Sequence, residues 1–197
     1  MTINFGWKPD LPDPRDFKFK GVLAPHKLPK QVDLRSLQSA VYNQLSLGSC
    51  TANAICAQFD YEYKLKKNTF INPSRLFLYY NEREIEGTVD EDSGAYIRNG
   101  IKSCAKTGIC TEHLYKYDID KFKQKPPQEC YSEAEKFKID LYERISSLED
   151  LKVALAEGNT VSFGFYVYKS FMSEKTAKTG KMTKPRKGEE MLGGHAV

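Results

Sequence analysis

Three side chains in this 197-residue sequence have the types and the order needed for nucleophilic catalysis by sulfur: Gln44, Cys50 and His195. Apolar residues recur at three- and four-residue spacing after Cys50, which predicts an amphipathic helix that begins at the cysteine. A helix N-terminus favours thiolate over thiol, so we expect Cys50 to have a lowered pKa and to act as the nucleophile, with His195 as its general base. The side-chain amide of Gln44 and the backbone N–H of Cys50 would stabilise an oxyanion beside the sulfur.

Each of these residues, taken alone, also has a purely structural interpretation. Most free cysteines are small core residues, and a single histidine is usually a surface or core residue. His195 is one of only three histidines, however, and it follows Gly193 and Gly194, which leave space around its ring. The order of the three side chains favours the catalytic interpretation over the structural one, because a glutamine precedes a cysteine at a helix start and a histidine follows far along the chain.

The first 30 residues differ in composition from the rest of the chain. Residues 1–30 hold five of the nine prolines, and proline blocks helices while favouring extended backbone. Such a segment cannot build its own core, so its apolar side chains need a groove on the folded body; they are Phe5, Trp7, Leu11, Phe17 and Phe19. Two roles stay open: a structural strap, or a short inhibitory pro-segment lying in or near an active-site cleft, which accepts extended peptides.

Residues 31–145 have the pattern of a mainly helical lobe that carries the nucleophile. Asn72 and Pro73 predict the N-cap and the first residue of a second helix. Helical spacing over residues 95–105 predicts a third helix, and residues 131–141 can form a short charged one.

An acidic run, Asp90-Glu91-Asp92, breaks the pattern between the second and third helices. It could bind a cation or a basic substrate side chain. The structural alternative is a solvated turn, which is the usual role of such residues next to glycine.

Residues 146–197 have the pattern of the start of a β lobe. Ser147 opens a capping box for a helix that runs to about residue 157, and alternating residues over 161–168 predict a strand with one apolar face. A lysine-rich excursion over 168–188 then leads to a second strand beginning near Met191. Two strands leave open edges and do not close a sheet. We therefore expect the natural protein to continue beyond the last residue and to complete this lobe.

Composition argues against several classes of partner. The net charge of +4 is mild, and the basic stretch over residues 175–187 lacks the aromatics that stack on bases, so no nucleic acid is expected. No apolar run approaches the roughly 20 residues that cross a membrane. The N-terminus also lacks the apolar core of a signal peptide, which favours a cytoplasmic or virion-associated protein.

The four cysteines other than the nucleophile candidate raise the question of bridges and metals. An unpaired number without a secretion signal favours a reducing compartment, although one bridge among Cys104, Cys110 and Cys130 is compatible with the sequence. Those three with His113 would make a Cys₃His zinc set, but their spacing fits no standard zinc finger. We therefore expect no metal and no cofactor.

Together these motifs resemble the papain (cathepsin-type) family of cysteine peptidases, in its bacterial and viral branch with a short N-terminal extension. The matching segments, in order, are Leu28–Arg35, Gln44–Cys50, Ser93–Tyr96, Gly108–His113, Lys125–Tyr131 and Gly193–Val197. The resemblance implies an α+β fold of two lobes, a helical lobe with the nucleophile and an antiparallel β-barrel lobe, here incomplete, with the histidine. It also implies a thiol protease that cleaves polypeptide substrates through an acyl-enzyme, with Ser93, Gly94 and Gly194 presenting backbone to the substrate.

The sequence departs from the family pattern in two ways. Leu47 and Thr51 stand where the family usually has a disulfide-bonded cysteine and an aromatic residue. The family's third catalytic residue, an asparagine beyond the histidine, has no counterpart. The resemblance therefore implies a missing C-terminal segment of the same protein as a partner.

Several functions fit these observations. A peptidase, held as a latent zymogen if the N-terminal arm is inhibitory, is the first. A papain-like fold that binds without catalysis is the second, and a thiol acyltransferase that uses the same acyl-enzyme is the third.

Overall fold

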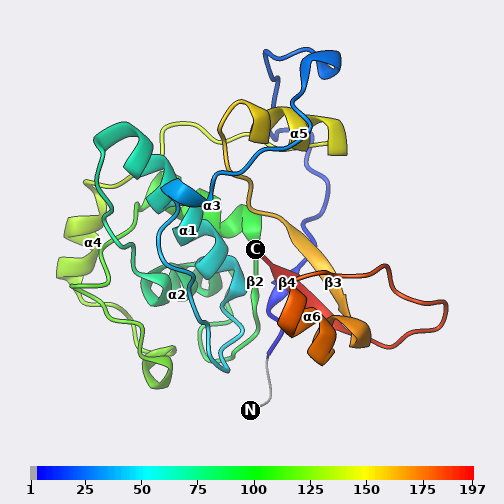
Figure 1. The fold of residues 1–197 in the computed structure, drawn as a ribbon. Coiled ribbons are helices and arrows are strands. Elements are labelled where there is room, and N and C mark those ends of the chain that lie inside the picture. The colour runs from blue at the N-terminus through cyan, green and yellow to red at the C-terminus, as the bar shows by residue number, and fades with distance from the viewer. Residues whose placement is uncertain (1–3) are drawn as a thin grey trace.

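The larger part of the molecule is a helical lobe, seen in a computed structural model that describes residues 4–197. Its helices, on the left of Figure 1, are α1 (Cys50–Lys67), α2 (Arg75–Glu86), α3 (Ile97–Lys106) and α4 (Gln128–Ala134). Their apolar faces enclose one core, to which Ile55, Phe59, Leu76, Phe77 and Ile109 contribute. Short 3-10 turns lie at Arg35–Leu37 and Ile119–Lys121.

The ends of these helices follow local chemistry. The predicted start of α1 at Cys50 is confirmed, and its C-cap Asn68 has the left-handed conformation, φ 56°, that an asparagine tolerates. The second helix begins later than predicted. Ser74, rather than Asn72, is its N-cap, because the Ser74 side chain accepts a hydrogen bond from the Phe77 N–H.

The ranges of the next two helices were predicted less well. The third helix begins at Ile97 because the two residues before it form strand β2 (Ala95–Tyr96). α4 begins three residues earlier than predicted and ends at Ala134, so the prediction of helix over 135–141 was wrong.

A buried arginine fixes the loop that follows α2. Arg83 is fully buried, and its guanidinium donates to the backbone oxygens of Val89 (2.6 Å), Glu91 (3.2 Å) and Phe122. Burial lowers the pKa of this arginine. Its hydrogen bonds are with uncharged carbonyls, so the loop over residues 88–93 depends on one side chain from the helix below it.

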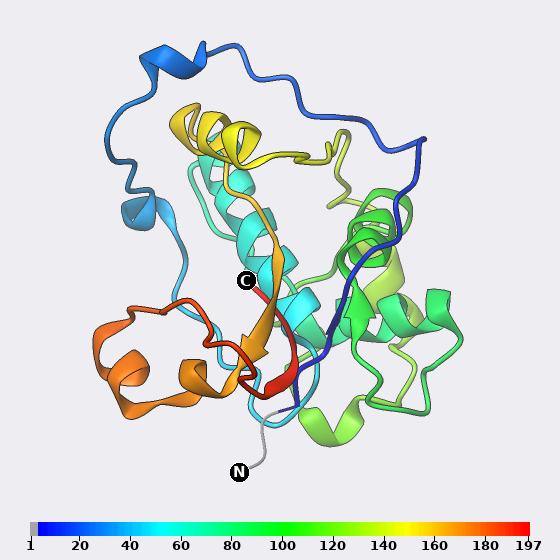
Figure 2. The same ribbon diagram turned by 90° about the vertical axis from the view of Figure 1, so that its right-hand side faces the viewer.

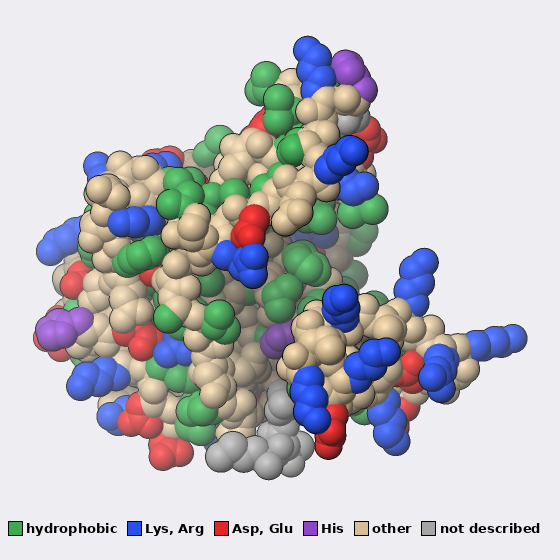
Figure 3. Space-filling model, in the orientation of Figure 1, with side chains coloured by type: hydrophobic (Ala, Val, Ile, Leu, Met, Phe, Trp, Pro, Cys, Tyr) green, Lys and Arg blue, Asp and Glu red, His purple; other side chains and the backbone are tan. Residues whose placement is uncertain are grey.

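The second lobe contains α5 (Leu148–Ala156), β3 (Gly164–Tyr168), α6 (Glu174–Thr179) and β4 (Met191–Ala196), with a 3-10 turn at Lys169–Met172. The predicted cap of α5 is confirmed, since the Ser147 side chain accepts from the Asp150 N–H. β3 and β4 pair antiparallel as a two-stranded sheet, with Phe165 opposite His195. The lysine-rich excursion forms α6 and a long loop, and its lysines project at the right of Figure 3.

The N-terminal segment connects the two lobes. Strand β1 (Trp7–Lys8) runs parallel to β2, and Gly6 forms a parallel bridge with Gly194 of β4. In Figure 2 this dark blue segment passes between β2 and β4. We refer to the place where α1, β2 and β4 meet as the "lobe junction".

Beyond β1 the segment continues across α3 and α5. The Asp16 carboxylate accepts hydrogen bonds from Nε (3.1 Å) and Nη2 (2.6 Å) of Arg98, and Glu157 accepts from the N–H groups of Val22 and Leu23. A 3-10 turn follows at Pro25–Lys27. The expectation that every apolar residue of the segment needs a groove was wrong for two of them, because Leu11 and Phe17 are 76% and 67% exposed.

The described residues show neither a disulfide nor a group of side chains placed as metal ligands. All five cysteines are free and buried. Across residues 4–197, no three His, Cys, Asp or Glu side chains gather in a way that could hold a metal ion. The same residues contain no helix long and apolar enough to span a membrane.

Replacing Arg83 by methionine should destabilise the fold, because it leaves buried loop carbonyls without donors. We expect Arg83→Met to lower the free energy of unfolding by about 3 kcal/mol or more. Urea unfolding followed by circular dichroism measures this change. Arg35→Met is the matched control, since the Arg35 side chain is 88% exposed and its loss should leave stability nearly unchanged. Equal midpoints for the two variants would contradict this account of the loop.

Candidate active site

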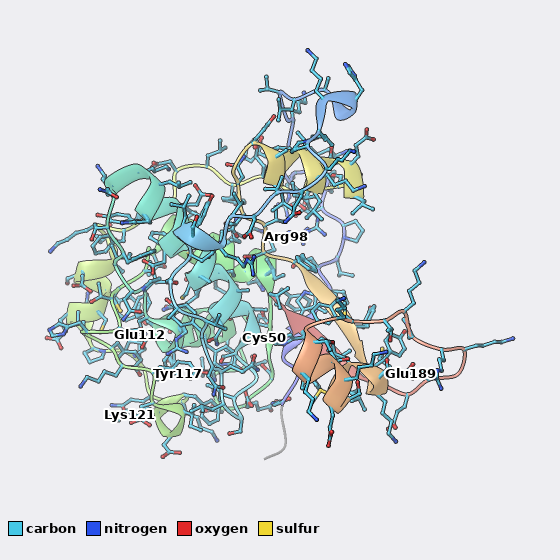
Figure 4. All side chains as sticks on the ribbon, in the orientation of Figure 1. Cys50, Arg98, Glu112, Tyr117, Lys121 and Glu189 are labelled. Carbon is cyan, nitrogen blue, oxygen red and sulfur yellow. The ribbon has the colours of Figure 1, made fainter. Side chains whose placement is uncertain are left out.

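Cys50 is the first residue of α1 and is fully buried at the lobe junction. Figure 4 labels it beside the end of β4. Ser49, the N-cap, does not cap the helix with its side chain; its hydroxyl instead pairs with the Tyr117 hydroxyl at 2.5 Å. Ala54, Ala196 and Trp7 pack around the cysteine. The thiol therefore lies where one lobe, the other lobe and the N-terminal segment all touch.

The charge state of this thiol differs from the sequence-based expectation. Burial raises the pKa of Cys50 above the ordinary value of 9.0, although the backbone N–H groups of Ala196, Gly6 and Thr51 act in the opposite direction. The predicted lowering of this pKa was therefore wrong for this state of the molecule. Desolvation of the thiolate outweighs the helix N-terminus and the three amides.

His195 lies on β4, with its ring between two aromatic rings. Its centroid is 6.2 Å from that of Phe5 and 5.8 Å from that of Phe165, both in edge-on geometry. Burial lowers the pKa of His195 below 6.5. Its Nδ1 atom is buried and has no hydrogen-bond partner among the described residues. Both shifts favour the uncharged forms, a thiol and an imidazole, over an ion pair.

Gln44 directs its amide into the same junction. Its Nε2 donates to the backbone oxygens of Asn4 (3.2 Å) and Leu47 (2.9 Å), while its own backbone oxygen accepts from the Tyr117 hydroxyl. The side-chain donor proposed for an oxyanion thus binds a peptide carbonyl of the N-terminal segment. Gln44, Cys50 and His195 are each in contact with this segment.

Glycines from both lobes surround residues 4–8. A Cβ added at Gly94 would overlap the backbone of Gly6, one added at Gly6 would overlap that of Gly48, and one added at Gly194 would overlap the Trp7 carbonyl. Gly94 and Gly194, singled out in the sequence, therefore line the junction with bare backbone. The Ser93 hydroxyl instead bonds to Thr88 and to the Gly94 carbonyl, within its own turn.

Asp92 is a site residue that sequence reasoning did not single out. Its carboxylate accepts from the Gly48 N–H (3.0 Å), the Tyr79 hydroxyl (2.5 Å) and the Asn4 side-chain amide (2.6 Å). It therefore fixes the turn before Cys50 as well as the N-terminal segment. The acidic run marked the region, but the sequence did not show which of the three carboxylates turns inward.

Glu82 is a second such residue, fully buried beneath the first turn of α1. Its Oε2 accepts from the Thr51 hydroxyl at 2.8 Å, and its Oε1 is buried without a hydrogen-bond partner within residues 4–197. Burial raises its pKa well above 4.5. Its hydrogen bond anchors Thr51, the residue next to Cys50, and its proximity adds to the raised pKa of the thiol.

Comparisons with known proteins agree with this geometry. Residues 28–197 match the model of the papain family cysteine proteases. An uncharacterised peptidase C1-like protein of Acanthamoeba polyphaga mimivirus is 42% identical over 225 residues, covering 100% of this chain and 72% of the viral protein.

Two solved structures show the same fold. Xylellain, a cysteine protease from Xylella fastidiosa, superposes with a TM-score of 0.86 at 36% identity, covering 100% of this chain and 78% of xylellain. A procathepsin B from Trypanosoma congolense, at 16% identity and a TM-score of 0.68, covers 93% of this chain and 66% of its own and shows the likeness of the fold alone. Because the family model matches most of the chain, this protein belongs to the papain family of cysteine proteases and has its α+β, papain-like fold.

Proposed function

We propose that this protein hydrolyses peptide bonds of polypeptide substrates through a Cys50 acyl-enzyme, and that the state described here is latent. One observation supports both parts: three consecutive residues of the N-terminal segment each contact one catalytic group. The Asn4 carbonyl accepts from the Gln44 amide, the Phe5 ring lies against His195, and the Gly6 N–H faces the Cys50 sulfur. A bound substrate would have to occupy the positions that these three residues fill.

Catalysis would begin once the segment leaves the lobe junction. His195, no longer packed against Phe5, takes the thiol proton of Cys50, and the thiolate attacks the substrate carbonyl carbon. Donors from the Gln44 amide and the Cys50 backbone stabilise the charge on the carbonyl oxygen. The imidazolium of His195 then protonates the leaving amine, and the neutral imidazole activates water to hydrolyse the thioester.

The segment is held along its length by polar contacts with the helical lobe. Lys8 forms an ion pair with Glu86 at 3.1 Å. Asp16 forms another with Arg98, the residue labelled in Figure 4. The Gly6 carbonyl accepts from the Ala95 N–H at 2.8 Å. These contacts lie outside the catalytic groups, so release of the segment need not disturb Cys50 or His195. The segment thus has the properties of an inhibitory pro-segment as well as those of a strap.

The chemical proposal is tested by labelling and hydrolysis. We expect a peptidyl epoxide to alkylate Cys50 and fluorogenic peptides to be cleaved, and both should be lost in Cys50→Ala. Mass spectrometry of the labelled protein locates the modification. Labelling without hydrolysis would support an acyltransferase. A well-folded protein that is neither labelled nor active after release of the segment would support a binding role.

Latency makes a separate prediction. An added methyl group at Gly6 overlaps the Gly48 backbone, so Gly6→Ala should displace the segment and raise the rate of Cys50 alkylation roughly tenfold or more. Val22→Ala is the control, because Val22 belongs to the same segment and is 92% exposed.

The pH dependence should differ between the two states. In the latent chain, alkylation should be slow near neutral pH and should rise only in the alkaline range, because the pKa of Cys50 is raised above 9.0. In Gly6→Ala the thiol can pair with His195, so alkylation should persist to lower pH. Identical rates and pH profiles for wild type and Gly6→Ala would remove the latency proposal while leaving the peptidase proposal intact.

A further inference from the structure

The net positive charge of the chain lies in one part of the second lobe. Residues 169–190, which we refer to as the "basic excursion", join β3 to β4 and contain α6. They hold seven Lys or Arg and three Asp or Glu, so their net charge of +4 equals that of the whole chain, and the other residues balance. The excursion extends away from both lobes in Figure 1, and its lysines project from the surface in Figure 3.

The acidic groups of the excursion are already engaged within it. Glu189 accepts from the backbone N–H groups of Ser170 (2.5 Å) and Arg186 (2.8 Å). The other two form ion pairs, Glu174 with Lys178 at 3.3 Å and Glu190 with Lys169 at 3.8 Å. The remaining cations are exposed and form no ion pair with a carboxylate of residues 4–197; they are Lys175, Lys181, Lys184, Arg186 and Lys187. Such side chains in water are charged near neutral pH, so an acidic ligand finds five unpaired cations here.

An apolar cavity lies at the base of the excursion. It has a volume of about 270 Å³ and opens between β3 and residues 182–185 of the loop. Lys184 is one of its lining residues, and the apolar ones are Phe165, Tyr166, Tyr168, Phe171, Met182 and Pro185. Apolar walls beside unpaired cations suit a ligand that combines acidic groups with an apolar side chain.

The cavity adjoins the proposed catalytic groups through one aromatic ring. Phe165 lines the cavity and lies opposite His195 in the sheet, with the two ring centroids 5.8 Å apart. The excursion ends where β4 begins at Met191, roughly 13 Å along the strand from His195. A polypeptide that reaches Cys50 and His195 can therefore lay its flanking residues on the excursion.

These surroundings favour an acidic polypeptide over other acidic partners. A second copy of the chain brings no net negative charge outside the excursion. Residues 175–187 contain no aromatic side chain on which a base could stack, and the rings of Phe165 and Phe171 meet edge-on at 5.5 Å instead of offering an open face. The neighbouring groups, moreover, are those proposed to act on peptide bonds.

We propose that the basic excursion is a docking surface for an acidic segment of the polypeptide substrate, away from the scissile bond, and that one apolar side chain of this segment enters the cavity. The inference rests on the proposed peptidase function, for which it names a substrate class. The five cations are exposed while the N-terminal segment occupies the lobe junction. Docking should therefore occur in the latent chain as well.

Binding is measured without catalysis in a Cys50→Ala background, by fluorescence anisotropy of a labelled peptide of Asp, Glu and Ser with one central Phe. Reversing three excursion lysines should weaken binding about tenfold or more; the changes are Lys181→Glu, Lys184→Glu and Lys187→Glu. The matched control reverses three exposed lysines of the helical lobe that form no ion pair, through Lys67→Glu, Lys116→Glu and Lys136→Glu. It changes the net charge equally and should keep the affinity within roughly twofold.

The cavity is tested through the central Phe. Met182→Ser should weaken binding of the Phe peptide roughly fivefold but leave unchanged the binding of a peptide with Ser in place of Phe. Met172→Ser is the control, because Met172 is also about half exposed but lies outside the cavity lining. Equal effects of the two substitutions would overturn the role of the cavity.

Several results would overturn the docking surface itself. One is equal affinity of the excursion and control variants. Another is equal affinity for the acidic peptide and for its Asn and Gln counterpart, a comparison that needs no change in the protein. Tighter binding of duplex RNA or phosphatidylserine vesicles than of the peptide at about 0.15 M salt, or dimerisation that the excursion variant abolishes, would assign the surface to those partners instead.

Cleavage separates this inference from the peptidase proposal. Gly6→Ala should cleave a fluorogenic peptide with acidic ends at roughly tenfold higher kcat/KM than one with Asn and Gln ends and the same centre, through KM alone, because docking adds uniform binding. Equal cleavage of the two would overturn docking and leave the peptidase proposal standing. Docking by anisotropy without cleavage of either peptide would remove the peptidase proposal and leave a surface that binds acidic polypeptides.

Discussion

The structure depends on a close approach of bare backbone at the lobe junction. Gly94 from the helical lobe and Gly194 from β4 leave no room for a Cβ against residues 4–8, and Gly6 of the segment leaves none against the backbone of Gly48. The same absence of side chains that lets a peptide lie beside Cys50 lets the N-terminal segment lie there. Glycine is costly in a strand because it loses more conformational freedom than other residues, so its use at this junction has a steric reason.

Burial at this junction decides the charge of the catalytic groups. The end of a helix stabilises a nearby charge by about 0.3–1 kcal/mol, less than the ~1.4 kcal/mol that corresponds to one pKa unit. Full burial moves pKa values by up to several units. With the segment in place, burial raises the pKa of Cys50 and lowers that of His195, which favours their uncharged forms. Under the latency proposal, release of the segment would reduce this burial and make the thiol more reactive.

The sequence predicted the features that arise from local patterns. The start of α1, the capped start of α5 and the strand β3 follow from spacing, a cap and alternation. The choice of Gln44, Cys50 and His195 followed from their residue types and their order around a helix start, and the family resemblance supported it. What the sequence did not show are the outcomes of burial: the raised pKa of Cys50, the exposure of Phe17 and the inward direction of Asp92. Each depends on which segments meet in space.

Asp92 shows how one side chain can connect the turn before Cys50 with the N-terminal segment. Its bond to the Gly48 N–H shapes the turn that delivers Cys50 and Gln44, and its bond to the Asn4 amide retains the segment. A carboxylate that must order the turn cannot be removed without cost, since Gly48 N–H and Tyr79 would lose their acceptor. The segment therefore has to present a donor to an acceptor that the turn already holds in place, and the side-chain amide of Asn4 does so.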